Sequence, residues 1–400
     1  MGDTRVTTRE KQSMKRQAVA IKNLLGVEER SSGLLRDDQL STPDPALKFG
    51  AGTEFLSVLR GRVDDYFSTT GRPRRDCPQM YVKTAIIFTW LTTSYITLVF
   101  VASTWWQTLP LVISLGLAMA AVGFNIQHDG GHQAYSNYPL INKLTALTLD
   151  LLGGSSYAWD RKHNSIHHTY TNITGHDGDI NLGFLGRLSP HQKRLKFHRL
   201  QHFYLWVLYG FMAIKWQVYD DFRDVLIGRI HGQSFARPKG GDLIVFIVGK
   251  LVFFSVAFVI PMILCEAWAV LLCYFVAAFV QGVTLSVVFQ LAHCVEDADF
   301  PMPERGTQRI ENAWAIHQVE TTVNFARQNR LVAWFTGGLN FQIEHHLFPR
   351  ICHLNYPAIS MLVEETSREF GVAYAAHESF SSGVVSHFRW LRQMGMPDAA

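Results

Sequence analysis

Histidine is concentrated in three short clusters of this sequence. The densest spans residues 163–168 and reads HNSIHH, so three imidazoles lie within six residues. On a helix, positions i, i+4 and i+5 lie side by side, and the three side chains are expected to point into one pocket. Imidazole is a common protein ligand of iron, zinc and copper. Taken alone, however, this segment would more often be a solvated polar helix.

Two further clusters favour a metal site. His128 and His132 are also four residues apart, in the segment HDGGH. The third cluster, residues 342–346, reads QIEHH and ends in His345 and His346. Together the clusters hold seven of the 17 histidines. We therefore predict that the three segments converge on one shared metal site.

The composition points to a membrane protein. Of the 400 residues, 48% are hydrophobic, and they gather in runs long enough to cross the roughly 30 Å hydrocarbon core of a bilayer. The predicted spans are residues 84–103, 109–127, 243–264 and 267–291, and Lys250 is their only charged residue. We predict an all-α integral membrane protein with four transmembrane helices in two hairpins. A cytoplasmic helical cap is expected to carry the three histidine clusters.

The chain is expected to divide into three parts. Residues 1–75 form a polar N-terminal region without a cleavable signal, residues 76–355 the membrane domain, and residues 356–400 a C-terminal tail. Between the hairpins, the apolar segments 140–152 and 203–214 are too short to span, so we interpret them as interfacial or buried helices. The short turns at the other ends of the spans carry no Lys or Arg, whereas the segment between the hairpins contains many basic residues, among them Lys193, Arg194, Lys196 and Arg199.

This charge asymmetry predicts the topology. By the positive-inside rule, the segment between the hairpins, the metal site and both termini face the cytoplasm. The membrane would be the plasma membrane in a bacterium or the endoplasmic reticulum in a eukaryote. The second span ends immediately before His128, and the fourth ends two residues before His293. Each hairpin would thus deliver a histidine to one membrane face, where an apolar substrate can enter sideways.

Other features of the composition exclude alternatives. The five cysteines have no CxxC or paired spacing, which argues against a disulfide framework and against a thiolate zinc site. The net charge of +4 is small and gives no indication of nucleic-acid binding.

The pattern H-x3-H, H-x3-H-H and Q-x2-H-H, with two membrane hairpins, resembles the membrane fatty acyl desaturases. Gln342, the pair His317-Gln318 and the run from Thr321 to residues 337–340, which read GGLN, resemble the front-end subgroup of this family. The resemblance covers about residues 80–355. It implies oxygen-dependent desaturation of a long fatty acyl chain, as acyl-lipid or acyl-CoA, with a cis double bond formed at a di-iron centre.

The resemblance also implies the ligands of the two iron ions, with no catalytic residue beyond the metal centre. Gln342 stands where many relatives have a histidine, so its contact with metal, direct or through water, stays open. Carried over residue by residue, the metal ligands are His128, His132, His163, His167, His168, His293, Gln342, His345 and His346.

The chemistry supports this assignment independently of the family. Removing hydrogen from an unactivated methylene needs a redox-active metal, which zinc is not. Four carboxylates beside the clusters could accept hydrogen bonds from the far ring nitrogens and so orient the rings: Asp129, Asp177, Asp179 and Glu344. Of the other histidines, we expect His317 to support the site and His353 to lie on the surface. We place the remaining candidates outside the ligand set: His176, His198 and His202.

The electrons should come from a separate protein. Many front-end relatives carry a fused haem domain marked by His-Pro-Gly-Gly, and this motif is missing from the sequence. We therefore expect an external donor of ferredoxin or cytochrome type, and the basic residues between the hairpins would suit an acidic one. Two alternatives stay open: a fatty acyl hydroxylase or acetylenase on the same scaffold, and, more distantly, a zinc-dependent membrane hydrolase or receptor.

Overall fold

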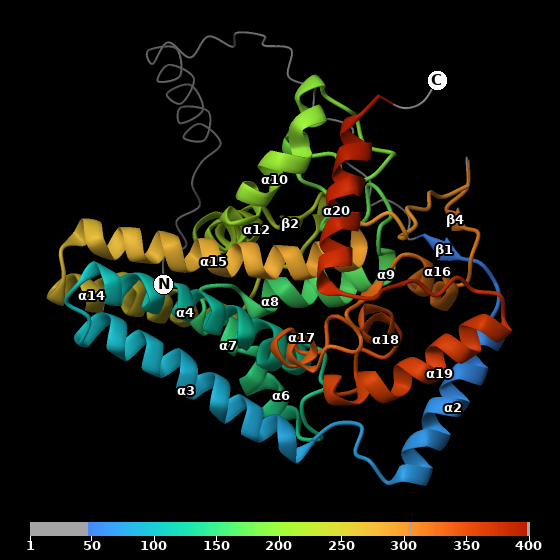
Figure 1. Cartoon of the computed structure of the whole chain (residues 1–400), viewed down its shortest axis with the longest axis horizontal. Helices are drawn as coiled ribbons and strands as arrows, with labels where there is room; N and C mark the ends of the chain where they lie inside the picture. The colour runs from blue at the N-terminus through green and yellow to red at the C-terminus, as the bar shows by residue number, and fades with distance from the viewer. Residues whose placement is uncertain (1–46, 305, 398–400) are drawn as a thin grey trace, which may run out of the picture. The chain divides into compact units, whose positions relative to one another are not determined.

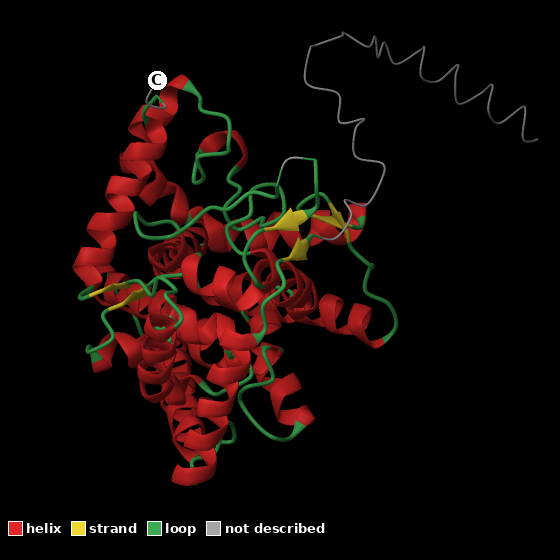
Figure 2. Ribbon diagram, turned by 90° about the vertical axis from the view of Figure 1, so that its right-hand side faces the viewer, coloured by secondary structure: helices red, strands yellow, loops and turns green. Residues whose placement is uncertain are grey.

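The computed structural model describes residues 47–304 and 306–397. The chain divides into two units, Met1–Pro43 and Asp44–Ala400, and all described residues belong to the second. Most of the predicted N-terminal region therefore lies outside the described residues. The described part is mainly helical, and its short strands pair into three two-stranded sheets (Figure 2).

The predicted all-α architecture with four candidate spans is confirmed. Each long apolar segment has 23 to 27 residues, more than the roughly 20 needed to cross a bilayer. The segments are Pro78–Phe100 (α3), Trp105–Gly131, Gly241–Leu264 and Ala267–His293 (α15). The second consists of α4 (Trp105–Val122), a π-helical turn η1 (Gly123–Gln127) and α5 (His128–Gly131). The third consists of α13 (Gly241–Phe254), a π-helical turn η6 (Ser255–Val259) and α14 (Ile260–Leu264).

The two hairpins meet where α4 packs against α15 (Figure 1). Gly116 permits a close approach, because a Cβ atom there would lie only 2.5 Å from the carbonyl oxygen of Ala277. Small residues commonly allow such contacts between membrane helices, where packing rather than hydrophobicity drives association. The contact holds the histidine-bearing ends of the second and fourth spans next to each other.

A chain of short helices connects the hairpins. The two apolar segments interpreted as interfacial or buried helices fall in α6–α7 and α10–α11, with exposed side chains such as Leu140 and Phe203. The elements are α6 (Pro139–Ala146), α7 (Thr148–Leu151), α8 (Ser156–Trp159), the π-helix η2 (Asp160–His167), α9 (His168–Tyr170), η3 (Gly183–Leu185), η4 (Lys196–Leu200), α10 (Gln201–Tyr209), α11 (Phe211–Lys215), η5 (Trp216–Asp220), α12 (Asp221–Ile227) and the antiparallel pair β2 (Arg229–Ile230) and β3 (Gln233–Ser234).

Buried ion pairs attach these short helices to the third span. Lys250 is buried in α13, and its Nζ lies 2.9 Å from Oδ2 of Asp221 on α12. An unpaired charge at such a depth would be costly, so the pair binds the two elements together. Lys162, which precedes His163, lies 3.0 Å from Oδ2 of Asp224 on the same helix. Helix α12 therefore also holds the segment that carries the second histidine cluster.

The remaining elements form a cap at the histidine-bearing ends of the spans (Figure 1). Strand β1 pairs in parallel with β4, and β5 pairs in parallel with β6. The elements are β1 (Lys48–Phe49), α2 (Glu54–Thr70), β4 (Arg309–Ile310), α16 (Trp314–Glu320), β5 (Asn324–Phe325), α17 (Arg330–Phe335), α18 (Gln342–Leu347), η7 (His353–Asn355), α19 (Tyr356–Glu369), β6 (Ala376–His377) and α20 (Phe380–Gly395).

The core of the cap joins segments from both ends of the chain. Helix α2 buries one apolar side chain per turn, Phe55, Leu59, Val63 and Phe67, as expected for one face of a helix. This face packs against α18 and α19 in a shared hydrophobic cluster. Residues on either side of the expected boundaries at 75 and 355 thus share one core with the third histidine cluster. The division into three parts stays a prediction.

Candidate metal centre

The four segments that carry the predicted ligands come together at one place. The first cluster ends the second span, the second lies on η2 and α9, and the third lies on α18, while His293 ends α15. All the predicted ligands are buried: His128, His132, His163, His167, His168, His293, Gln342, His345 and His346. The convergence expected from the spacing is therefore present in the structure.

The second cluster lies on a π-helix. The backbone N–H of His168 donates to the carbonyl of His163, a five-residue step that is characteristic of this conformation. Because of this wider turn, His167 and His168 both lie about one turn beyond His163. The ring of His167 stacks on that of His163 with centroids 5.3 Å apart. A second π-helical turn, η1, precedes His128. Such turns are frequent at functional sites, and the histidine spacing does not distinguish them from an α-helix.

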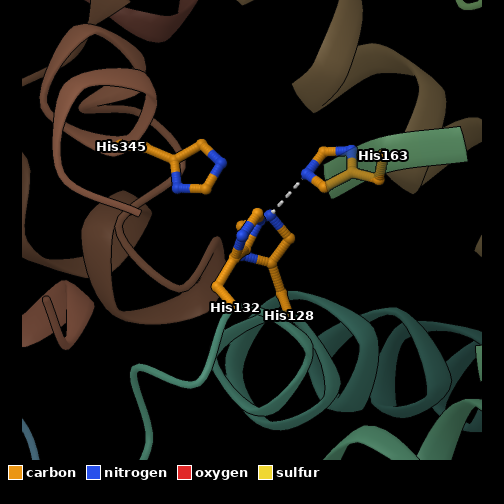
Figure 3. A group of neighbouring side chains, drawn as sticks. All are labelled: His128, His132, His163 and His345. Atoms are coloured by element: carbon orange, nitrogen blue, oxygen red, sulfur yellow. Dashed lines mark hydrogen bonds between the residues drawn. The ribbon is translucent and has the colours of Figure 1, made fainter. Parts of the chain in front are cut away.

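One group of four histidines, which we call group one, draws on all three clusters (Figure 3). It consists of His128, His132, His163 and His345, whose ligand-capable nitrogens all lie within 4.8 Å of one another. Nε2 of His128 is 3.2 Å from Nε2 of His163. The Nε2 atoms of His132 and His345 are buried without a hydrogen-bond partner. Their lone pairs face the centre of the group.

Group two consists of His167, His293 and His346, again with nitrogens within 4.8 Å of one another. The side-chain amide of Gln342 lies in this group, with Nε2 3.0 Å from Nε2 of His293 and 3.4 Å from Nε2 of His346. Rotation of this amide by 180° would bring its oxygen to the same place. The amide of Gln342 therefore lies where it could serve as a fourth ligand in group two.

His168 connects the two groups. Its Nε2 is 3.2 Å from Nε2 of His163 in group one. Its ring stacks on that of His346 in group two, with centroids 4.3 Å apart. His168 also forms a third ligand-capable set with His345 and His346. The two groups are thus immediate neighbours, an arrangement that suits a pair of metal ions.

The protonation of these rings suits metal binding. Burial, reinforced by the neighbouring imidazoles, lowers the pKa of His163, His168, His345 and His346 well below the usual histidine value. The rings are therefore neutral at physiological pH, and each has a free lone pair. A buried nitrogen without a partner costs free energy, which a bound cation would recover. The donor set of nearly pure imidazole fits iron, copper or zinc by its chemistry.

Three residues orient the ligands from outside. Nδ1 of His167 lies 3.1 Å from Oδ2 of Asp177, and Nδ1 of His346 lies 2.8 Å from Oε1 of Gln318. Nδ1 of His345 lies 3.3 Å from the hydroxyl of Tyr356. Such contacts fix the tautomer and direct the other nitrogen toward a metal.

The comparison with known proteins identifies the family. A family model described as fatty acid desaturase matches residues 103–377, which is more than half of the chain. This chain belongs to the fatty acid desaturase family. It is therefore an enzyme, an oxidoreductase of lipid metabolism, and with its four apolar helices a membrane protein. The more distant alternative of a hydrolase or receptor is excluded by this membership.

Several relatives of the desaturase are similar along most of its length. It is 39% identical over 351 residues to the sn-1 linoleoyl-lipid 6-desaturase of Arthrospira platensis, which covers 87% of this chain and 94% of the relative. The sn-1 linoleoyl-lipid 6-desaturase of Synechocystis is 38% identical, covering 87% and 98%. An acyl-lipid (8-3)-desaturase of Physcomitrium patens is 35% identical, covering 86% and 72%. These similarities confirm the resemblance to front-end desaturases.

The four carboxylates expected to orient the ligands have different roles in the desaturase. Asp177 accepts from His167 as expected, whereas Asp179 is 3.6 Å from the same nitrogen, too far for a hydrogen bond. Asp129 and Glu344 do not bond to any predicted ligand among the described residues. Glu344 instead accepts from Asn324 Nδ2 at 2.8 Å and from the Tyr374 hydroxyl at 2.9 Å, and burial raises its pKa to about 7.

The expectation that His353 lies on the surface is wrong. Its side chain is 2% exposed, and Nδ1 is 2.9 Å from Oδ2 of Asp129. Its Nε2 is 2.9 Å from Nζ of Lys83 on the first span. The buried row Lys83–His353–Asp129 therefore connects the first span and η7 to the first histidine cluster. Sequence spacing does not reveal this contact, because the three residues are far apart in the chain.

The other histidines lie outside the two groups. His317 is buried beside β1, where its ring centroid lies 5.1 Å from that of Phe49. Nε2 of His198 contacts the carbonyl oxygen of Phe184, and the ring of His202 packs against Phe388. His176 packs against Tyr170. None of these four belongs to a ligand-capable group within residues 47–304 and 306–397.

The positions of Gln318 and Tyr356 were not predicted as part of the site. Gln318 belongs to the run that resembles front-end desaturases, but its sequence position does not indicate which ring it contacts. Tyr356 follows the resembling region and begins α19. Its hydroxyl reaches His345 because α18 and α19 pack together. Only the three-dimensional fold identifies these two residues.

Proposed function

We propose that this desaturase introduces a cis double bond into a long acyl chain of a membrane lipid, using dioxygen at two iron ions. The observation that carries the proposal is the pair of neighbouring histidine groups at the ends of the apolar spans. Seven buried imidazoles of groups one and two, with His168 between them and Gln342 beside them, would hold the metal. These residues come from four separate segments of the chain, so the site depends on the tertiary fold.

When bound, the iron pair would supply from dioxygen the oxidising power needed to remove hydrogen from unactivated carbons. The overall reaction removes two hydrogen atoms from adjacent methylenes. One dioxygen molecule, two electrons and two protons are also consumed, and two water molecules form.

The protein would contribute orientation and exclusion of water. Asp177, Gln318 and Tyr356 hold the far nitrogens of three ligands, so the metal-facing nitrogens stay aligned. The residues of both groups are buried, which would keep bulk solvent from the oxidising site. Beyond the metal centre we assign no catalytic residue.

The names of the relatives support the proposed substrate class. The names sn-1 linoleoyl-lipid 6-desaturase and acyl-lipid (8-3)-desaturase describe acyl chains that are carried on lipids. We propose that this enzyme also acts on an acyl-lipid and places its double bond between an existing one and the carboxyl end. Acyl-CoA is the alternative carrier.

We propose that the metal centre and the cap face the cytoplasm. The turns at the opposite ends of the spans, residues 101–104 and 265–266, contain no Lys or Arg, which is typical of the outer side. A separate ferredoxin- or cytochrome-type donor would then deliver electrons from the cytoplasm.

Expression of the intact chain in a host of known lipid composition tests the proposal. Mass spectrometry of the lipids should detect a new cis double bond, its position and the lipid class that carries it. Metal analysis of the purified protein should find two irons and little zinc per chain. A hydroxylated or acetylenic product would establish the alternative reaction on the same scaffold, and a zinc-loaded, active protein would contradict the di-iron centre.

A further inference from the structure

A surface arm that the proposed reaction does not use extends from the short helices between the hairpins. We define the arm as residues 184–209, which include η4 and α10. In Figure 1, α10 lies to the left of α20 and above span α15. Helices α10 and α11 both pack against α15. The arm therefore begins at a membrane span and continues outward from it.

One face of the arm is apolar and uncovered. Five large apolar side chains along it are between 45% and 69% exposed: Phe184, Phe197, Leu200, Phe203 and Val207. Of these, Phe203 also contacts Phe388 of α20, with ring centroids 5.9 Å apart. Exposed apolar surface on this scale is unusual in water and marks a contact with a membrane or another protein. Aromatic side chains are also typical of the boundary between lipid and water.

The opposite face of the arm is firmly attached to α20. Gln201 donates from Nε2 to the carbonyl of Leu391 at 2.8 Å, and the indole of Trp390 donates to the carbonyl of Leu188 at 2.8 Å. Gly395 lies so close that a Cβ atom there would be 2.3 Å from the carbonyl oxygen of His198. Because α20 covers this face, the exposed apolar face cannot turn inward. The arm is a rigid element with one uncovered side.

Three cations interleave with the apolar residues. Lys193, Lys196 and Arg199 are exposed, and within the described ranges none has a carboxylate partner within 4.0 Å. Alternation of cations with aromatic and aliphatic side chains is the pattern of a segment lying in the interface of an anionic membrane. A soluble acidic donor would satisfy the three charges but would leave the apolar face in water.

We propose that the arm lies on the surface of the bilayer, with its apolar face among the lipids and its three cations bound to anionic headgroups. The occupant of this surface is thus anionic lipid. The inference rests on the four spans and not on the reaction, so it can fail while the desaturase function holds. With Lys193, Lys196 and Arg199 bound to lipid, these residues do not dock the acidic electron donor, the role that their charge alone had suggested.

The first test measures the depth of the arm in reconstituted vesicles. A nitroxide is attached at Phe197→Cys or Phe203→Cys after replacement of the accessible thiols, Cys265→Ser and Cys273→Ser. Collisions with oxygen, which concentrates in lipid, are compared with collisions with a water-soluble nickel complex. The ratio should be several-fold higher than at the control Met361→Cys, because Met361 is an exposed apolar residue of α19, within the cap. Equal ratios would overturn the membrane placement.

The second test measures lipid selectivity with the full chain in vesicles. Spin-labelled phosphatidylglycerol should associate with the wild-type protein several-fold more strongly than spin-labelled phosphatidylcholine. The variant Lys193→Gln/Lys196→Gln/Arg199→Gln should lose most of this preference. A matched variant removes three exposed cations of the cap and should retain it: Lys48→Gln/Arg60→Gln/Arg368→Gln.

A donor assay decides between lipid and protein as the occupant. In detergent without anionic lipid, reduction by an acidic ferredoxin should proceed at the same rate in the wild type and in the arm variant. If the arm variant instead keeps its lipid selectivity but is reduced several-fold more slowly, the arm is a donor-docking surface and the proposal is wrong.

Discussion

At the residue scale, His167 shows how one ring nitrogen can orient a ligand while the other stays available to a metal ion. In His167 one nitrogen contacts Asp177, while the other is buried without a partner and faces group two. Burial opposes the charged form of this ring, but the carboxylates of Asp177 and Asp179 outweigh that effect and raise its pKa. The same carboxylates would make the ring a stronger metal donor.

Replacing a ligand should abolish the activity without removing the protein from the membrane. For His345→Ala we expect no desaturated product in the host's lipids and a loss of bound iron, because His345 contacts residues of both groups. Immunoblotting of membranes controls for expression. His202→Ala is the matched control. His198 and His202 have the same i, i+4 spacing as the predicted ligands but lie outside the two groups, so this variant should retain product. If His345→Ala forms as much product as His202→Ala, His345 does not belong to the ligand set.

Replacing Asp177 should weaken metal binding more than replacing Asp179. Asp177→Asn removes the negative acceptor 3.1 Å from His167 Nδ1, and such changes typically lower metal affinity about 10- to 100-fold. Asp179→Asn should have a smaller effect, because its carboxylate is 3.6 Å away. Competition with a chelator of known affinity measures the metal affinity of both variants. An equal loss in the two variants would mean that the charge, not the hydrogen bond, orients the ring.

At the scale of elements, the contact between α4 and α15 determines whether the histidine-bearing ends meet. Gly116→Val should destabilise the protein by about 1–3 kcal/mol, since a side chain there overlaps the backbone of α15. Gly61→Ala on α2 is the control, because a Cβ atom there meets nothing within 4 Å. This control should stabilise the helix by up to about 1 kcal/mol. Thermal unfolding in detergent compares the two, and an unaffected Gly116→Val protein would show that the helices can separate freely.

Helix α20 should make stability sensitive to acid. His387 is buried between the carbonyl of Cys294 and the hydroxyl of Tyr209, and burial lowers its pKa to about 4. In the unfolded chain its pKa is about 6.5. Below pH 6.5 the unfolded state therefore binds a proton that the folded state excludes. The contribution of His387 is complete above about pH 6.5 and falls by about 3 kcal/mol as the pH approaches 4.

Unfolding measured at pH 7.5 and pH 4.5 tests this dependence. The variant His387→Gln should lose less stability between these two pH values than the wild type. Other buried histidines titrate in both proteins, so the difference between the proteins is the informative quantity. Identical losses would assign the acid sensitivity elsewhere.

At the scale of the whole molecule, the candidate metal centre joins elements that are far apart in sequence. Its predicted ligands come from the second span, η2 and α9, α15, and α18. Bound iron should therefore stabilise the folded state as a ligand does, by about 2.7 kcal/mol at a free concentration 100 times the dissociation constant. Removal of iron by a chelator should lower the unfolding temperature, and readdition should restore it. In His345→Ala the shift should be much smaller; an unchanged shift would mean that the iron binds elsewhere.

Much of the architecture can be predicted from local patterns in the sequence. An apolar run of about 20 residues can satisfy its backbone in lipid only as a helix, so the four spans could be predicted without knowledge of the fold. The spacing of His163, His167 and His168 likewise sets them about one helical turn apart. Both features depend on neighbours in sequence, and both predictions agree with the structure.

The grouping of the histidines and the partners of the residues around them depend on long-range packing. Which histidines share a group depends on the approach of α18 to the second span, and no local pattern encodes that approach. For the same reason Asp129 contacts His353, which is 224 residues away, rather than a ligand. Tyr356 is near His345 in sequence, but its hydroxyl reaches the ring only because α18 and α19 pack together. A side chain's partner is the nearest group in space, and in this molecule that group is often more than 100 residues away in the chain.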